Sequence, residues 1–141
     1  MRLGSAVLVD LEGTLSNCAH RLHHLVMKDY DNWNTKLEFD YPKSDIIYMV
    51  KALSRTCDIV ITTAKSDKYL EITLDWLHKN IPFEFRLVMR KEGDKRPSTE
   101  VKQEFAEHIW SKGKRILLAI DDREDICQMY KGILIETLQV K

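Results

Sequence analysis

Carboxylates follow several apolar stretches of this 141-residue sequence, at positions where strands would end. The run VLV leads into Asp10, and Glu12 stands two residues further on. A later apolar run leads into the adjacent Asp121 and Asp122. Carboxylates from two strand ends form an oxygen site suited to Mg²⁺, and an ionised aspartate can attack phosphorus without first losing a proton. These residues therefore predict phosphoryl-transfer chemistry with Mg²⁺ as cofactor.

Hydroxyl groups and cations follow the other strand-like runs. Thr62, Thr63 and Lys65 come after the second run, and Lys102 lies in the first turns of a predicted helix after the third. A lysine and a threonine hydroxyl can hold phosphate oxygens, while a second carboxyl protonates the leaving oxygen and later deprotonates water. The set thus predicts a site for hydrolysis of a phosphate ester.

The apolar pattern predicts the elements that position these groups. Strand-like runs rich in Val, Ile and Leu lie at 6–9, 59–61, 86–89 and 116–120, with a weaker fifth at 133–135. Helical patterns between them begin near Ser44, near Ser66 or Asp67, near Ser98 or Thr99, and near Asp122. Alternation of this kind predicts an α/β, Rossmann-like, mainly parallel sheet flanked by helices. Residues 17–43 do not fit it and are interpreted as an insertion, partly helical at 20–27.

Composition narrows the class of protein. With 44% apolar and 31% charged residues, we expect one globular domain over 1–141. A net charge of zero argues against non-specific binding to long nucleic acid, although residues 85–102 hold six basic side chains against three acidic ones.

No apolar run is long enough for a membrane span, and the start lacks a signal-peptide pattern. Three widely spaced cysteines favour a reducing, cytoplasmic location.

The motifs together resemble the haloacid dehalogenase-like (HAD) hydrolase superfamily. The resemblance is carried by DLEGTL at 10–15, Thr62, Lys102 and IDDRED at 120–125. HRLHHL at 20–25, DNW at 31–33 and MRKEGDKRPSTEVK at 89–102 are similar to segments of phage-type homologues of the polynucleotide kinase phosphatase domain. The sequence contains no GxxxxGK(S/T) loop of the kind that a kinase half carries.

The resemblance implies a HAD-like fold with a minimal cap insertion and a role for each matching residue. Asp10 is implied to be the nucleophile that becomes an aspartyl-phosphate, and Glu12 the acid–base residue. The implied Mg²⁺ ligands are Asp10, the backbone carbonyl of Glu12 and Asp121, with Asp122 beside them. The implied phosphate-holding and substrate-binding residues are Thr62, Lys102, Gly13, Thr14, Thr63 and Lys65.

Three positions depart from the family pattern. Glu12 replaces its second aspartate, Ala64-Lys65 replaces a glycine-arginine pair, and Ser98 replaces an aspartate. Lysine keeps the positive charge at position 65 but loses bidentate recognition of phosphate. Glutamate keeps the acid at position 12 with one more methylene, so we expect the acid–base function to be retained.

Other residues have two interpretations each. Arg21 is expected near the catalytic opening, where it could meet a substrate phosphate or base, or else pack on the surface. Arg96 could contact a nucleic-acid backbone or lie in solvent, and Tyr30 and Trp33 could stack on a base or pack the insertion onto the sheet. The sequence predicts a Mg²⁺-dependent phosphomonoesterase for nucleotides or polynucleotide 3′-phosphate ends. The alternative is a catalytically impaired protein that binds nucleotides or nucleic acid.

Overall fold

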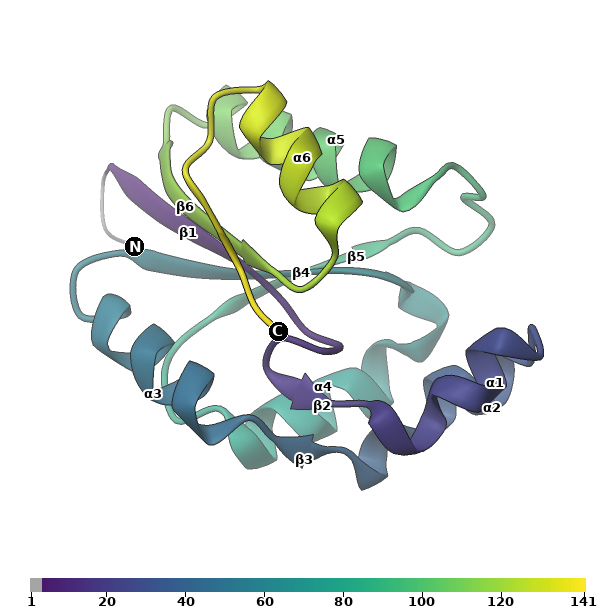
Figure 1. Cartoon of the computed structure of the whole chain (residues 1–141). Helices are drawn as coiled ribbons and strands as arrows, with labels where there is room; N and C mark the ends of the chain where they lie inside the picture. The colour runs from purple at the N-terminus through teal and green to yellow at the C-terminus, as the bar shows by residue number, and fades with distance from the viewer. Residues whose placement is uncertain (1–3) are drawn as a thin grey trace.

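A five-stranded sheet forms the centre of the computed structural model, which describes residues 4–141 (Figure 1). Its strands are β1 (Ser5–Asp10), β4 (Asp58–Ser66), β5 (Arg86–Arg90), β6 (Arg115–Asp121) and β7 (Thr137–Gln139). They follow the order β5-β4-β1-β6-β7, and each neighbouring pair is parallel. The predicted Rossmann-like α/β fold is therefore confirmed.

Helices cover both faces of the sheet (Figure 1). The helices α3 (Ser44–Leu53) and α4 (Leu70–Asn80) pack with Val7 and Val9 of β1 in one core cluster. On the opposite face, α5 (Ser98–Ser111) and α6 (Glu124–Gly132) pack with Ala6 and Leu8. Alternate residues of one strand point to opposite faces, so the continuous apolar run of β1 serves both clusters.

The predicted insertion forms a small separate layer beside the strand ends (Figure 1). A two-stranded antiparallel sheet of β2 (Ser16–Asn17) and β3 (Tyr41–Pro42) closes its base. Between these strands the chain forms the 3₁₀ helix Ala19–Arg21, α1 (Leu22–Val26), α2 (Tyr30–Thr35) and the 3₁₀ helix Lys36–Phe39. The part expected to be helical at 20–27 lies mostly in the first two of these elements.

The prediction of a fifth strand at 133–135 was wrong. Backbone N–H groups of Ile133, Leu134 and Ile135 bond carbonyls at the end of α6, so these residues form the turn that leaves the helix. Leu134 has a φ of +67° and is 93% exposed. Only Ile135 is buried, and the strand begins at Thr137. The apolar run reflects a helix exit rather than a strand.

Some helix starts also differ from the predictions. Ser66 does cap its helix, because its hydroxyl accepts a hydrogen bond from the Lys68 N–H at the 3₁₀ helix Asp67–Tyr69 that precedes α4. The capping position of α5 is Pro97 rather than Ser98 or Thr99, and that of α6 is Arg123 rather than Asp122. Ser98 and Asp122 are therefore left to make other contacts.

None of the helices in residues 4–141 combines the length and the apolar character that a membrane span requires. The three cysteines, Cys18, Cys57 and Cys127, are free thiols. Cys57 and Cys127 are buried in the core.

Candidate active site

Asp10 lies at the carboxyl end of β1 and is 6% exposed. Its Oδ1 accepts a hydrogen bond of 2.7 Å from Lys102 Nζ, and its Oδ2 accepts one of 3.1 Å from Thr14 Oγ1. Burial raises the pKa of Asp10 well above its ordinary value; Lys102 opposes this effect, while Asp121 and Asp122 add to it. A cation bound at this place would therefore lower the pKa of Asp10, and an anion that attracts Lys102 would raise it.

Parallel pairing brings the predicted strand-end residues together. Asp10 is the register partner of Thr62 on β4, and β6 on the other side of β1 ends at Asp121. Lys102 reaches the same place from α5, and its Nζ donates to Asp121 Oδ2 at 2.6 Å as well as to Asp10. Burial would lower the pKa of Lys102, but the two carboxylates outweigh it and the pKa is raised. The ammonium group is therefore charged at neutral pH.

Carboxylate oxygens of Asp10, Asp121 and Asp122 lie within 4.8 Å of one another. Gly13 makes this grouping possible, because it has a φ of +80° and a Cβ there would lie 2.2 Å from Asp122 Oδ2. Burial also raises the pKa of Asp122. A compact set of carboxylate oxygens at two adjacent strand ends fits the ligand preference of Mg²⁺.

Glu12 points away from this cluster and into a group of cations. Its Oε1 accepts a hydrogen bond of 2.9 Å from Thr63 Oγ1. Its Oε2 lies 2.9 Å from Lys65 Nζ and 3.4 Å from Arg21 Nη2. Burial would raise the pKa of Glu12, but Lys65 and Arg21 outweigh it and lower the pKa to about 2. Glu12 is thus held as a carboxylate.

Arg21 connects Glu12 to the insertion. Its side chain is fully buried and forms a two-bond pair with Asp40, with Nε–Oδ1 at 2.8 Å and Nη2–Oδ2 at 2.6 Å. Arg21 Nη1 donates to the Trp33 carbonyl at 2.6 Å, and the guanidinium lies 4.3 Å from the centre of the Trp33 ring. In this position Trp33 packs within the insertion, and a substrate could reach Arg21 only if the insertion opened.

The basic segment before α5 forms a rim rather than part of the buried site. Arg96 is exposed and pairs with Asp94 at 2.7 Å and with Glu104 at 2.6 Å. The Ser98 hydroxyl, at the position where the family pattern has an aspartate, accepts a hydrogen bond of 3.3 Å from Arg90 Nη2. Ser98 therefore helps to hold the segment against β5.

Asp40 and Lys43 are two residues of this region that sequence reasoning missed. Asp40 lies at the end of the insertion, and the Ser16 hydroxyl also donates to it at 2.8 Å. Lys43 Nζ donates to the carbonyl of Gly13 at 3.0 Å and to the carbonyl of Lys141 at 2.9 Å. Neither residue lies in a periodic pattern, so the only available signal was that charged residues border the insertion.

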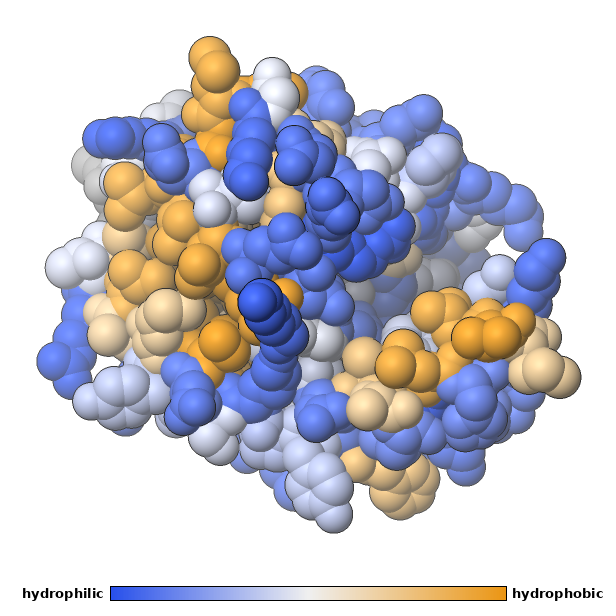
Figure 2. All heavy atoms as spheres, viewed as in Figure 1, coloured by the Kyte–Doolittle hydropathy of each residue, from blue (hydrophilic) through white to orange (hydrophobic). Residues whose placement is uncertain are grey.

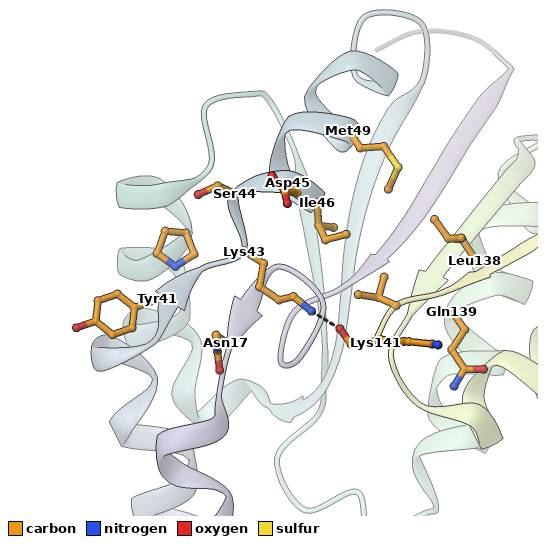
Figure 3. A pocket seen from close by; sticks show the side chains of 12 residues that line it. Asn17, Tyr41, Lys43, Ser44, Asp45, Ile46, Met49, Leu138, Gln139 and Lys141 are labelled. Atoms are coloured by element: carbon orange, nitrogen blue, oxygen red, sulfur yellow. Dashed lines mark hydrogen bonds between the residues drawn. The ribbon is translucent and has the colours of Figure 1, made fainter.

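A cavity of about 590 Å³ lies on the far side of Lys43 (Figure 3). It is lined by residues of β3, the start of α3 and the end of the chain, among them Ile46, Met49 and Leu138. None of the predicted site residues lines this cavity. Lys43 lines this cavity, and its ammonium group ties the Gly13 turn to the end of the chain.

The surface beside the strand ends is hollowed. On the right of Figure 2, a hollow separates hydrophilic surface above from an apolar surface over α1 and α2 below. The exposed apolar residues of this part include Leu22, Leu25, Val26 and Met27. The insertion therefore contributes an apolar surface beside the hollow.

Comparison with protein families gives one match over nearly the whole chain. The model of the polynucleotide kinase PNKP phosphatase domain matches residues 4–141. Curated protein sequences gave no match.

Solved structures give the same relation. Chains in two structures, of the "Pnkp1/Rnl/Hen1 complex" and of the "Pnkp1/Rnl/Hen1 RNA repair complex", are each 25% identical, with TM-scores of 0.80 and 0.82. Each match covers 98% of this chain but only 46% and 42% of those chains, so this chain spans less than half of their length.

More distant structures share the fold. A HAD-like hydrolase from Streptococcus pneumoniae is 13% identical, with a TM-score of 0.72 over 98% of this chain and 85% of that one. A HAD family enzyme from Bacteroides thetaiotaomicron, solved with magnesium and inorganic phosphate as an Asp-to-Ala mutant, is 14% identical, with a TM-score of 0.60 over 98% and 94%. At these identities the likeness concerns the fold alone.

Proposed function

The chain belongs to the family of the polynucleotide kinase PNKP phosphatase domain within the HAD-like proteins, and from this premise we propose that it is a Mg²⁺-dependent phosphomonoesterase. The observation that carries the proposal is the position of Asp10. This carboxylate is held between Lys102 and Thr14, next to Asp121 and Asp122, at the carboxyl end of β1. A buried carboxylate fixed in this way is suited to attack a phosphorus atom in line.

Asp10 carries the phosphoryl group through two displacements. In the first, an oxygen of Asp10 bonds to phosphorus, and the ester P–O bond breaks with its electron pair leaving on the alcohol oxygen. In the second, water attacks phosphorus, the bond to Asp10 breaks and inorganic phosphate leaves. Thr62 and Lys102 hold phosphoryl oxygens during both steps. Asp10, Asp121, Asp122 and the Glu12 carbonyl would hold Mg²⁺, which when bound offsets the negative charge of the site.

Glu12 transfers the protons in this scheme. Its low pKa keeps it ionised, which is the form that can accept the proton of the attacking water in the second step. To protonate the leaving oxygen in the first step it must first gain a proton. A phosphate dianion that attracts Lys65 would weaken the contact of 2.9 Å between Lys65 and Glu12 and so raise the pKa of Glu12. Substrate binding itself would then prepare the acid.

The substrates are nucleotides or the 3′-phosphate ends of polynucleotides. The surface beside the strand ends is hollowed (Figure 2), and the segment that leads into α5 contains Lys91, Lys95 and Arg96. The similar Pnkp1 chains are found in an RNA repair complex. A phosphate at the end of a strand matches this open and partly basic setting.

A second candidate, a nucleotide-binding protein without turnover, is favoured by the ion pairs of Glu12. If Lys65 and Arg21 keep Glu12 ionised when substrate is bound, no acid protonates the leaving oxygen. Binding with thermal stabilisation by nucleotide and Mg²⁺ would then occur without phosphate release.

One experiment separates the two candidates. Phosphate release is measured with Mg²⁺ for 3′- and 5′-phosphorylated oligonucleotides, 3′- and 5′-mononucleotides and an aryl phosphate. The proposal expects turnover that is abolished by Asp10→Asn and by chelation of Mg²⁺. Asp75→Asn, at an exposed position of α4, is the matched control and should behave as the wild type. Turnover that survives Asp10→Asn contradicts the proposed nucleophile, and absence of turnover on every substrate favours the binding protein.

A further inference from the structure

Tyr130, on α6, carries a buried hydroxyl without a satisfactory partner. The residue is 1% exposed, and its hydroxyl oxygen makes no hydrogen bond of normal geometry within residues 4–141. A buried donor without a partner destabilises the folded protein, and native structures contain few such groups. A phenylalanine would fill the same volume without this disadvantage. The hydroxyl is therefore a candidate for a role other than packing.

The ring of Tyr130 lies beneath the phosphate-holding groups. Tyr130 belongs to the core cluster that contains Val60 of β4 and Ala106 of α5. Val60 is two residues before Thr62, so both side chains lie on the same face of β4. Ala106 is four residues after Lys102, so both lie on the same side of α5. The cluster thus leads from the Tyr130 ring to the two groups that the proposed function assigns to phosphate.

The electrostatics of Tyr130 agree with this placement. Burial raises the pKa of its hydroxyl to about 12, while Lys102 and the Thr62 hydroxyl act in the opposite direction. The hydroxyl is therefore protonated at neutral pH and near both groups. It remains a hydrogen-bond donor throughout.

Thr62 needs such a neighbour if it is to bind phosphate. A threonine hydroxyl has one proton to donate and lone pairs that accept. For that proton to point at a phosphoryl oxygen, a donor on the other side of Thr62 Oγ1 is favourable, and hydrogen bonds in such a chain strengthen one another. Lys102 is not free for this purpose, because its Nζ already donates to Asp10 and Asp121.

We propose that Tyr130 is a positioning residue whose hydroxyl donates to Thr62 Oγ1 when phosphate is bound and so directs the Thr62 proton toward a phosphoryl oxygen. No covalent step involves Tyr130, and it keeps its proton. The inference rests on the proposed function, because it assumes that Thr62 holds phosphate there.

A double-mutant cycle tests this inference. Tyr130→Phe, Thr62→Val and the double variant are compared with the wild type for kcat/KM and for the affinity of inorganic phosphate with Mg²⁺, measured by calorimetry. Tyr130→Phe should lower both by about tenfold, because loss of the hydrogen bond from Tyr130 to Thr62 weakens the hydrogen bond that Thr62 donates to the charged phosphate. In the Thr62→Val background the same change should have almost no effect. Tyr48→Phe, at a site 78% exposed, is the control.

Each outcome decides the matter. Unchanged phosphate affinity in Tyr130→Phe overturns the inference, with or without a change in Tm. An equal loss in the Thr62→Val background overturns it as well, because Tyr130 would then act independently of Thr62. If the wild type binds phosphate but releases none from any ester, the proposed function fails while the calorimetric cycle still tests Tyr130. If the wild type does not bind phosphate, both proposals fail.

Discussion

Asp10 and Glu12 are two residues apart, yet their carboxylates lie in opposite electrostatic environments. Asp10 shares its surroundings with two further carboxylates and a single lysine, and its pKa is raised, chiefly by burial. Glu12 is also mostly buried, with its side chain 14% exposed, but Lys65 and Arg21 lower its pKa to about 2. The difference teaches that the partners of a buried carboxylate, more than its depth, decide its charge. In the proposed scheme Asp10 requires a bound Mg²⁺ beside it. Glu12 requires the opposite, because its contact with Lys65 must weaken before it can act as an acid.

The largest effect is expected for Lys102→Met, which removes the ammonium group that is hydrogen-bonded to both Asp10 and Asp121. Breaking a buried ion pair on one side leaves unpaired charge and costs about 3–5 kcal/mol of unfolding free energy. Urea unfolding measures the loss, and phosphate release should fall below detection. Lys65→Met is the comparison variant. A loss of stability as large for Lys65→Met as for Lys102→Met would contradict the contrast between the two carboxylates.

Glu12→Gln should affect substrates unequally. Positioned acid–base catalysis contributes about 10²–10⁴-fold, so turnover of a nucleotide, whose leaving oxygen needs a proton, should fall by about this factor. An aryl phosphate with an acidic leaving group should lose much less in the first displacement. Comparison of kcat/KM for both substrates in both proteins checks this. Equal losses would mean that Glu12 acts chiefly through structure or only on the attacking water.

The low pKa of Glu12 should make the unfolding free energy depend on pH in the acid range. The pKa in the folded protein, about 2, lies below the ordinary value of 4.5. The contribution of ionised Glu12 to the unfolding free energy is therefore fully present above pH 4.5 and is lost as the pH falls toward 2. Its size is about 3 kcal/mol at most. Unfolding free energy measured from pH 6 to 2.5 should fall less steeply for Glu12→Gln than for the wild type; parallel curves would refute the ion-paired state.

Mg²⁺ should stabilise the folded protein through the carboxylates of Asp10, Asp121 and Asp122, and not through the side chain of Glu12. At a concentration 100 times its Kd, a ligand that binds only the folded state adds about 2.7 kcal/mol. We expect a rise in Tm with Mg²⁺ for the wild type and for Glu12→Gln, whose backbone carbonyl is unchanged. Asp121→Asn should abolish the rise. A rise that depends on the Glu12 side chain would place the metal elsewhere.

The parts of the site on regular strands could be predicted from the sequence. Parallel strands end at one edge of the sheet, so Asp10, Thr62 and Asp121 had to lie near one another once the strands were recognised. Pairings through the insertion could not be predicted in this way. Arg21 and Asp40 are 19 residues apart; Arg21 ends a short 3₁₀ helix, and Asp40 lies between two short elements, so neither belongs to a periodic pattern. The fifth strand was placed wrongly because an apolar helix exit and an apolar strand look alike over three residues.

The pairing of Arg21 with both Asp40 and Glu12 limits how this fold can be altered. Exchange of the segment between β1 and α3 is one way to alter the surface beside the strand ends. Here such an exchange would also remove a cation that sets the charge of Glu12, so a transplanted segment would need its own arginine and aspartate at matching places. Loop engineering at this position therefore has to treat the Arg21–Asp40 pair and the Glu12 turn after β1 as one unit.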